Sequence, residues 1–170
     1  MKNIYLIGMM GSGKSSSGRA LAKLLSLAFV DLDELIVEQE GRSINDIFKA
    51  EGESYFRSLE HELLAGVARE TDQVIATGGG IVLDPVNCEQ MKDSGLVIYL
   101  KTGLDVLWER VKTKQDRPLL KGSDPKQMLA NLYAKRSSLY EAVSDKVFLT
   151  DRKTPEAVAV EIYETCFKST

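Results

Sequence analysis

The sequence contains few of the residues from which metal centres and disulfide frameworks are built. Its 170 residues include one histidine, His61, and two cysteines, Cys88 and Cys166, which lie far apart and form no CxxC pair. This pattern argues against a zinc knuckle and fits a reducing compartment, so we expect a cytoplasmic protein with ordinary thiols. His61 has no partner at metal-ligand spacing, and we assign it no chemistry.

Long apolar runs and an excess of one charge are absent as well. No segment approaches the length of a membrane span, and no cationic leader with an apolar core opens the sequence. The net charge of −3 gives no broad basic field, which argues against nucleic acid or an anionic membrane as the main partner. With 44% hydrophobic residues the chain can bury one sizeable core, so we expect residues 1–170 to form a single domain that acts as a monomer.

A glycine-rich segment follows directly after the apolar run at residues 4–7. It reads GMMGSGKS over residues 8–15 and matches the P-loop pattern GxxxxGKS at each fixed position. Glycines let successive backbone N–H groups cradle phosphate oxygens, while Lys14 can reach the β- and γ-phosphates and Ser15 offers a hydroxyl to Mg²⁺. A chance match in a glycine-rich turn is the alternative, but the flanking apolar and amphipathic runs argue against it. The sequence therefore predicts a site for a nucleoside triphosphate.

Short apolar runs alternate with amphipathic segments along the whole chain, at residues 4–7, 28–31, 74–76, 96–100 and 146–149. This alternation predicts a three-layer α/β P-loop fold, with a five-stranded parallel sheet and helices on both faces. Three helices are predicted to begin where a capping side chain precedes proline, at Asp84, Asp124 and Thr154. Residues 102–105, Thr-Gly-Leu-Asp, are predicted to form a capping box.

Acidic residues and glycines follow two of the predicted strands, at the edge where ligands bind in open α/β sheets. Asp31 and Asp33 can both face the phosphates or an acceptor, although Asp33 could instead be only a helix N-cap. Residues 78–80 are three consecutive glycines. They suit a loop whose backbone closely approaches a ligand, or a turn that needs positive φ.

Arginines in this acidic protein indicate an anionic partner. Glu53 and Glu60 lie one turn to either side of Arg57, so they can hold it as a fork for a carboxylate; the alternative is a solvated ion pair. Residues 112–124, which include Arg117, are predicted to be a mobile lid over the phosphates, or else a surface connection whose leucine pair enters the core. Because Lys14, Arg117 and Mg²⁺ can serve the phosphates, Arg57 and Arg136 suggest an acceptor that carries a carboxylate.

With these residues in hand, the chain resembles the shikimate kinases over nearly its whole length. The motifs occur in family order and spacing, whereas generic P-loop kinases share only the first: GMMGSGKS at 8–15, DLD at 31–33, GESYFRSLE at 52–60, GGG at 78–80, RPLL at 117–120 and KR at 135–136. The resemblance implies ATP-dependent phosphorylation of the 3-hydroxyl of shikimate, in the chorismate route to aromatic amino acids.

The resemblance also implies roles for individual residues, with the acceptor-binding region spanning residues 33–61. The implied catalytic residues are Lys14, Asp33 and Arg117. The implied nucleotide-binding residues are Gly11, Ser12, Gly13, Lys14, Ser15, Ser16, Arg110, Arg117, Lys153 and Pro155. The implied shikimate-binding residues are Asp33, Arg57, Gly79, Gly80 and Arg136. Mg²⁺ would be held by Ser15 and, through water, by Asp31. The sequence departs from the family pattern at two positions: Ser16 stands where the family more often has Thr, and Lys153 where some relatives carry Arg. Both departures bear only on nucleotide affinity.

Two other classes of protein share part of this pattern. A gluconate- or nucleoside-type kinase would have the P-loop and lid, but the three glycines and paired arginines speak against it. A nucleotide-binding regulator of the GTPase kind would need an NKxD segment to recognise guanine, and the sequence has none.

Overall fold

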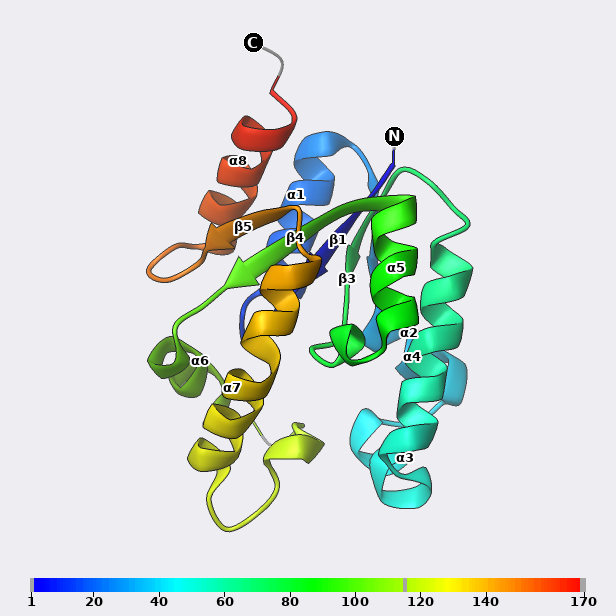
Figure 1. Cartoon of the computed structure of the whole chain (residues 1–170), viewed down its shortest axis with the longest axis vertical. Helices are drawn as coiled ribbons and strands as arrows, with labels where there is room; N and C mark the ends of the chain where they lie inside the picture. Colours follow the sequence, from blue (N-terminus) through cyan, green and yellow to red (C-terminus); the bar gives the residue numbers. More distant parts are fainter. Residues whose placement is uncertain (1, 115, 169–170) are drawn as a thin grey trace.

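The computed structural model describes residues 2–114 and 116–168, and Figure 1 shows a twisted sheet with helices packed on both faces. Met1, Gln115, Ser169 and Thr170 fall within the predicted domain or lid but lie outside the described residues. All strand pairings are parallel and the strand order is β2-β3-β1-β4-β5. The strands are β1 (Asn3–Ile7), β2 (Ala28–Asp31), β3 (Gln73–Ala76), β4 (Gly95–Lys101) and β5 (Lys146–Leu149). The predicted five-stranded parallel sheet is confirmed.

Two core clusters lie on opposite faces of the sheet, because successive strand residues point to opposite sides. Ile4 and Leu6 of β1 pack with α1 and α8, whereas Tyr5 and Ile7 pack in a second cluster with α5 and α7. The helices are α1 (Lys14–Leu25), α2 (Leu32–Glu40), α3 (Ile44–Glu51), α4 (Glu53–Val67), α5 (Pro85–Ser94), α6 (Leu104–Val111), α7 (Pro125–Val143) and α8 (Pro155–Cys166). No helix in the described part of the chain is both long enough and apolar enough to cross a membrane.

A third, smaller cluster joins α2, α3 and α4, the elements that contain most of residues 33–61. Its buried members are Ile36, Ile47, Phe56 and Leu59. Figure 1 shows α3 at the lower end of the molecule, with α4 running upward from it along one side. Residues 118–120, between α6 and α7, contact α3. The region expected to bind the acceptor therefore has a small core of its own.

The predicted helix starts at proline are confirmed, but the predicted capping box is wrong. Asp84, Asp124 and Thr154 each accept a hydrogen bond from a backbone N–H in the first turn of α5, α7 and α8. Thr102, in contrast, is buried and shares a hydrogen bond with the hydroxyl of Thr150, and Gly103 is the N-cap residue without a side-chain cap. The reason is tertiary: both threonines follow the paired strands β4 and β5, so each finds its partner across the sheet edge.

The segment predicted to be a lid contains a short 3-10 turn, η2 (Pro118–Leu120). Leu120 is 7% exposed and belongs to the core cluster beneath α7, while Leu119 lines a pocket described below. One leucine of the pair therefore enters the core, as the alternative reading expected. The mobility of residues 112–124 stays a prediction.

Candidate functional site

The P-loop connects β1 to α1 and curls around the ammonium group of Lys14. Gly11 and Gly13 have φ of +81° and +88°, a region that residues with a Cβ rarely adopt. The Lys14 Nζ donates hydrogen bonds to the carbonyl oxygens of Gly8 and Met9, at 2.8 and 2.9 Å. Burial lowers the pKa of Lys14 to about 8. The loop thus holds its cation in one place beside backbone N–H groups and the start of a helix.

Asp31 and Asp33 leave β2 and enter α2 with different hydrogen-bond partners. The Ser15 hydroxyl donates to Oδ2 of Asp31, and Oδ1 of Asp31 accepts from the backbone N–H groups of Asp33 and Glu34. Asp31 is therefore the N-cap of α2, and the reading of Asp33 as a mere N-cap is wrong. The Asp33 Oδ1 is buried and has no hydrogen-bond partner among the described residues. Burial, with a contribution from Asp31, raises the pKa of Asp33.

A cavity of about 440 Å³ lies over the P-loop at the carboxyl ends of the strands. This cavity brings together the residues predicted to bind the nucleotide and the metal ion. Its lining includes Gly11, Ser12, Gly13, Lys14, Ser15, Ser16, Asp31, Asp33, Arg110, Arg117, Lys153 and Pro155. Arg110 donates to the carbonyl of Gly11 at 2.9 Å, and Lys153 is ion-paired with Glu161. These side chains are therefore anchored at the rim of the cavity.

A smaller pocket adjoins the first, between α3, α4 and α7. This pocket brings together the residues predicted to bind the acceptor, namely Asp33, Arg57, Gly79, Gly80 and Arg136. Its lining also includes Phe48, Phe56, Glu60 and Pro118. Four residues line both cavities, namely Met10, Asp33, Gly79 and Arg117. A group bound in one cavity can therefore meet a group bound in the other beside Asp33 and Arg117.

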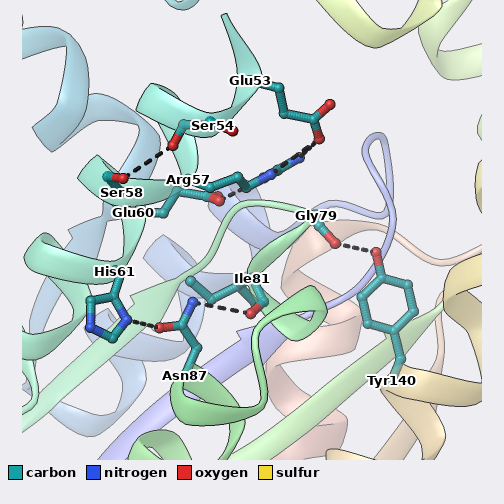
Figure 2. A network of polar contacts seen from close by, with 10 residues as sticks. All are labelled: Glu53, Ser54, Arg57, Ser58, Glu60, His61, Gly79, Ile81, Asn87 and Tyr140. Atoms are coloured by element: carbon teal, nitrogen blue, oxygen red, sulfur yellow. Dashed lines mark hydrogen bonds and ion pairs between the residues drawn. The ribbon is translucent and has the colours of Figure 1, made fainter.

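Acidic side chains hold Arg57 in a fixed pose on α4 (Figure 2). One side of the guanidinium contacts Glu53 at 3.1 Å, and Nη1 donates to Oε2 of Glu60 at 2.6 Å. Glu60 is only 1% exposed and burial raises its pKa, so the reading of a merely solvated ion pair is wrong for Glu60. On the opposite wall Arg136 is 2% exposed, and its Nε lacks a hydrogen-bond partner in the described part of the chain. Two guanidinium groups thus line one small pocket.

Two of the three glycines after β3 are closely packed against charged side chains, and none of the three is explained by its backbone angles. None of the three has positive φ, so the alternative of a positive-φ turn is wrong. A Cβ at Gly80 would collide with the guanidinium of Arg57, and a Cβ at Gly78 would collide with Glu60. At Gly79 the nearest atom would be Nη1 of Arg136, at 3.4 Å. The loop can therefore pass between the charged side chains only because it lacks side chains.

Several residues at the site were not expected from the sequence. Met10 and Thr77 line the large cavity, and Phe48 and Phe56 form a tilted ring pair in the wall of the smaller one. Tyr140 lies behind the glycine loop and donates to the carbonyl of Gly79. The only signal in the sequence for Tyr140 is its spacing of four residues from Arg136 on one helix.

Comparison with known proteins places this geometry in a family. The family model described as "Shikimate kinase" matches residues 10–167. A shikimate kinase of Legionella pneumophila (strain Corby) is 45% identical over 162 residues, which cover 95% of this chain and 93% of the relative. The chain belongs to the shikimate kinase family. The family resemblance drawn from the motifs is therefore confirmed.

Other shikimate kinases agree with this assignment. The relative from Xylella fastidiosa (strain M12) is 43% identical over 160 residues, 94% of this chain and 89% of the relative. A solved structure described as shikimate kinase from Acinetobacter baumannii in complex with shikimate superimposes with a TM-score of 0.94 at 35% identity, covering 99% of this chain and 96% of that one. Shikimate kinases are ATP-dependent kinases, so the large cavity over the P-loop belongs to a family that uses ATP.

Proposed function

We propose that this chain transfers the γ-phosphate of ATP to the 3-hydroxyl of shikimate, giving shikimate 3-phosphate and ADP. The observation that carries the proposal is the junction of the two cavities, because Asp33 and Arg117 line both. Phosphoryl transfer depends chiefly on placing the donor and acceptor in line and on neutralising charge. A cavity with a P-loop that opens onto a pocket with two arginines meets both needs.

In the larger cavity, the chain's own residues hold the triphosphate. Gly11 and Gly13 present backbone N–H groups to phosphate oxygens, and Lys14 contributes the ammonium group. Ser12 lies between the two glycines and closes the loop, because its backbone N–H donates to the carbonyl oxygen of Met9. Ser16 lies in the first turn of α1. Arg110 and Pro155 flank the base, with Lys153 nearby. Arg117 reaches the transferring phosphoryl group from the predicted lid, and its charge stabilises the transition state.

In the smaller pocket, Arg57 and Arg136 hold the carboxylate of shikimate, and Gly79 and Gly80 contribute backbone contacts. Asp33 accepts the hydrogen bond of the hydroxyl that attacks the phosphorus, because its buried Oδ1, which has no hydrogen-bond partner among the described residues, can orient that hydroxyl. As the new oxygen–phosphorus bond forms, the proton of the shikimate hydroxyl passes to Asp33, and the bond from phosphorus to the β,γ-bridging oxygen breaks to release ADP.

Ser15 and Asp31 fit a magnesium ion. Their oxygen atoms are the ligand type that Mg²⁺ prefers, and they lie in hydrogen-bond contact at the floor of the large cavity. In the described residues no group of three or more histidine, cysteine, aspartate or glutamate side chains could hold a metal ion. Mg²⁺ often takes few protein ligands and completes its shell with water and phosphate oxygens. When bound, Mg²⁺ neutralises charge on the phosphates.

We further infer that residues 1–170 act as a single-domain monomer in the cytoplasm, with shikimate as the partner and neither nucleic acid nor a membrane. Residues 33–61 form the acceptor-binding region and residues 112–124 the lid. Support comes from the net charge of −3, the two free cysteines and the small core that joins α2, α3 and α4. Light scattering after gel filtration checks the oligomeric state, and a dimer mass would contradict it.

The proposed reaction is tested by coupled measurement of ADP release with shikimate, gluconate, a nucleoside or no acceptor. We expect turnover with shikimate alone, and phosphorus NMR should place the new phosphate on the 3-hydroxyl. Lys14→Met should lower turnover by orders of magnitude while the protein stays folded, because the transition-state charge loses its partner. ADP release that is equal without an acceptor would point to a nucleotide hydrolase or regulator, and faster turnover of gluconate or a nucleoside would point to another kinase.

A further inference from the structure

Tyr140 is a fully buried polar residue near the end of α7, and none of the roles above requires it. Its hydroxyl donates a hydrogen bond of 2.5 Å to the carbonyl oxygen of Gly79. Figure 2 shows the phenol ring reaching Gly79 from α7, while Arg57 and Glu60 come from α4. The hydrogen bond therefore ties a helix to a loop that precedes it by 61 residues.

The phenol ring itself is held in place by the core. It stacks on the ring of Tyr99 in β4, with ring centroids 5.1 Å apart and planes inclined by 29°. The sulfur of Met9, at the start of the P-loop, lies 3.6 Å from the Tyr140 hydroxyl. Because the ring has neighbours on several sides, its hydroxyl can hold the Gly79 carbonyl in one direction only.

A hydrogen bond on the Gly79 carbonyl also sets the direction of the Gly80 N–H, since both groups belong to one planar peptide unit. In a trans peptide these two groups point to opposite sides. Gly79 and Gly80 line the smaller pocket, whereas Tyr140 does not. The phenol thus holds the peptide from the side of the core and directs the Gly80 N–H away from itself.

The same helix contributes a second group to this loop. Arg136 lies one turn before Tyr140 on α7, and its Nη1 would be the atom nearest to a Cβ at Gly79. Burial raises the pKa of Tyr140 to about 12, so its hydroxyl remains a donor over the pH range of ordinary assays. One rigid element therefore contributes the guanidinium beside the loop and the hydroxyl behind it.

We propose that Tyr140 is a positioning residue for the acceptor: through the Gly79 carbonyl it fixes the glycine loop relative to Arg136, so that both are presented together to the smaller pocket. The inference rests on the proposed function, because it takes shikimate to bind in that pocket. Tyr140 acts through the loop and does not touch the reacting atoms.

The substitution Tyr140→Phe tests this inference because it keeps the ring stack and removes the hydrogen bond. We expect the KM for shikimate to rise about tenfold, since the loop loses its anchor and a buried carbonyl is left unpaired. The KM for ATP should stay within about twofold of the wild-type value. Calorimetric titration of shikimate should show the same loss of affinity without turnover.

Tyr99→Phe is the matched control. It removes a hydroxyl from the same ring stack without touching the glycine loop, so it should leave both KM values unchanged. The inference is overturned if Tyr140→Phe only lowers the melting temperature, or if it raises both KM values equally. A wild-type protein that fails to bind shikimate in the same titration would instead overturn the proposed function, on which the inference rests.

Discussion

Asp31 and Asp33 are two residues apart, yet their surroundings assign them different tasks. Both oxygens of Asp31 are occupied, one by the Ser15 hydroxyl and one by two backbone N–H groups at the start of α2. Asp33 retains a buried oxygen without a partner in the described residues, and burial raises its pKa. A carboxyl group of this kind at the junction of the cavities is suited to orient an acceptor hydroxyl and to receive its proton.

The lowered pKa of Lys14 predicts a loss of activity in alkali. Because the free protein loses this cation as the pH rises through about 8, kcat/KM for ATP should fall about tenfold per pH unit above that value. The value of kcat should hold to higher pH, since bound phosphates favour the charged form. Initial rates at varied ATP between pH 6 and about 10 measure both profiles.

Loss of the Lys14 proton does not destabilise the fold in this pH range, so unfolding caused by Lys14 does not account for the expected fall in kcat/KM. The pKa of Lys14 is lower in the folded chain than its ordinary value of 10.5, so between these two values the unfolded chain binds more protons and this group favours folding as the pH rises. Melting curves over the same range serve as the control. A kcat/KM profile that stays flat to pH 10 would contradict a role for the Lys14 cation.

Arg136→Lys separates the shape of the guanidinium from its charge. A lysine keeps the positive charge but cannot make the two parallel hydrogen bonds of a guanidinium fork. We therefore expect the KM for shikimate to rise by an amount equivalent to ~1.5–3 kcal/mol, with little change in the KM for ATP. Arg42→Lys, in an ion-pair network on α2 and α3 outside both cavities, should change neither constant. Equal rises in both constants would make Arg136 a folding residue instead.

The glycine loop after β3 and the first turns of α4 fit together as one wall of the smaller pocket. The φ of Gly80 is −92°, an angle that alanine also adopts, so Gly80→Ala should leave the backbone intact. Its Cβ would nevertheless overlap the end of Arg57, which must then leave its pose between Glu53 and Glu60. We expect the KM for shikimate to rise about tenfold with a small change in melting temperature.

Gly66→Ala in α4 is the control for this substitution. A Cβ at Gly66 meets no atom within 4 Å, and alanine favours helix by roughly 0.5–1 kcal/mol. This variant should melt slightly higher and bind shikimate normally. A Gly80→Ala protein that keeps its affinity for shikimate would show that Arg57 does not need its observed pose.

The elements whose signals are local could be predicted from the sequence, and those set by distant contacts could not. Asp84, Asp124 and Thr154 cap the helices that follow them because cap and helix are adjacent in the chain. Thr102 fails as a cap because its partner, Thr150, follows β5 and lies 48 residues away in the chain. For the same reason the hydrogen bond from Tyr140 to the glycine loop has no local signature.

For the chain as a unit, the order of the strands explains where the site lies. From β3, on one side of β1, the chain crosses to β4 on the other side, so the P-loop after β1 lies where the strand order reverses. Ligands of open α/β sheets bind at such a point. The motif residues could be predicted because the carboxyl ends of the parallel strands β1, β2 and β3 all lie at this edge. The ring pair of Phe48 and Phe56 could not be predicted, because it depends on how α3 packs on α4.

The central claim is that a nucleotide over the P-loop and an acid between two arginines meet beside Asp33. The most direct test is a crystal structure of the chain with ADP, Mg²⁺ and shikimate. We predict that the terminal phosphate of ADP points toward the junction lined by Asp33 and Arg117, and that the shikimate carboxylate lies between Arg57 and Arg136 with its 3-hydroxyl toward Asp33. A terminal phosphate directed away from the smaller pocket, or shikimate bound elsewhere, would contradict the account.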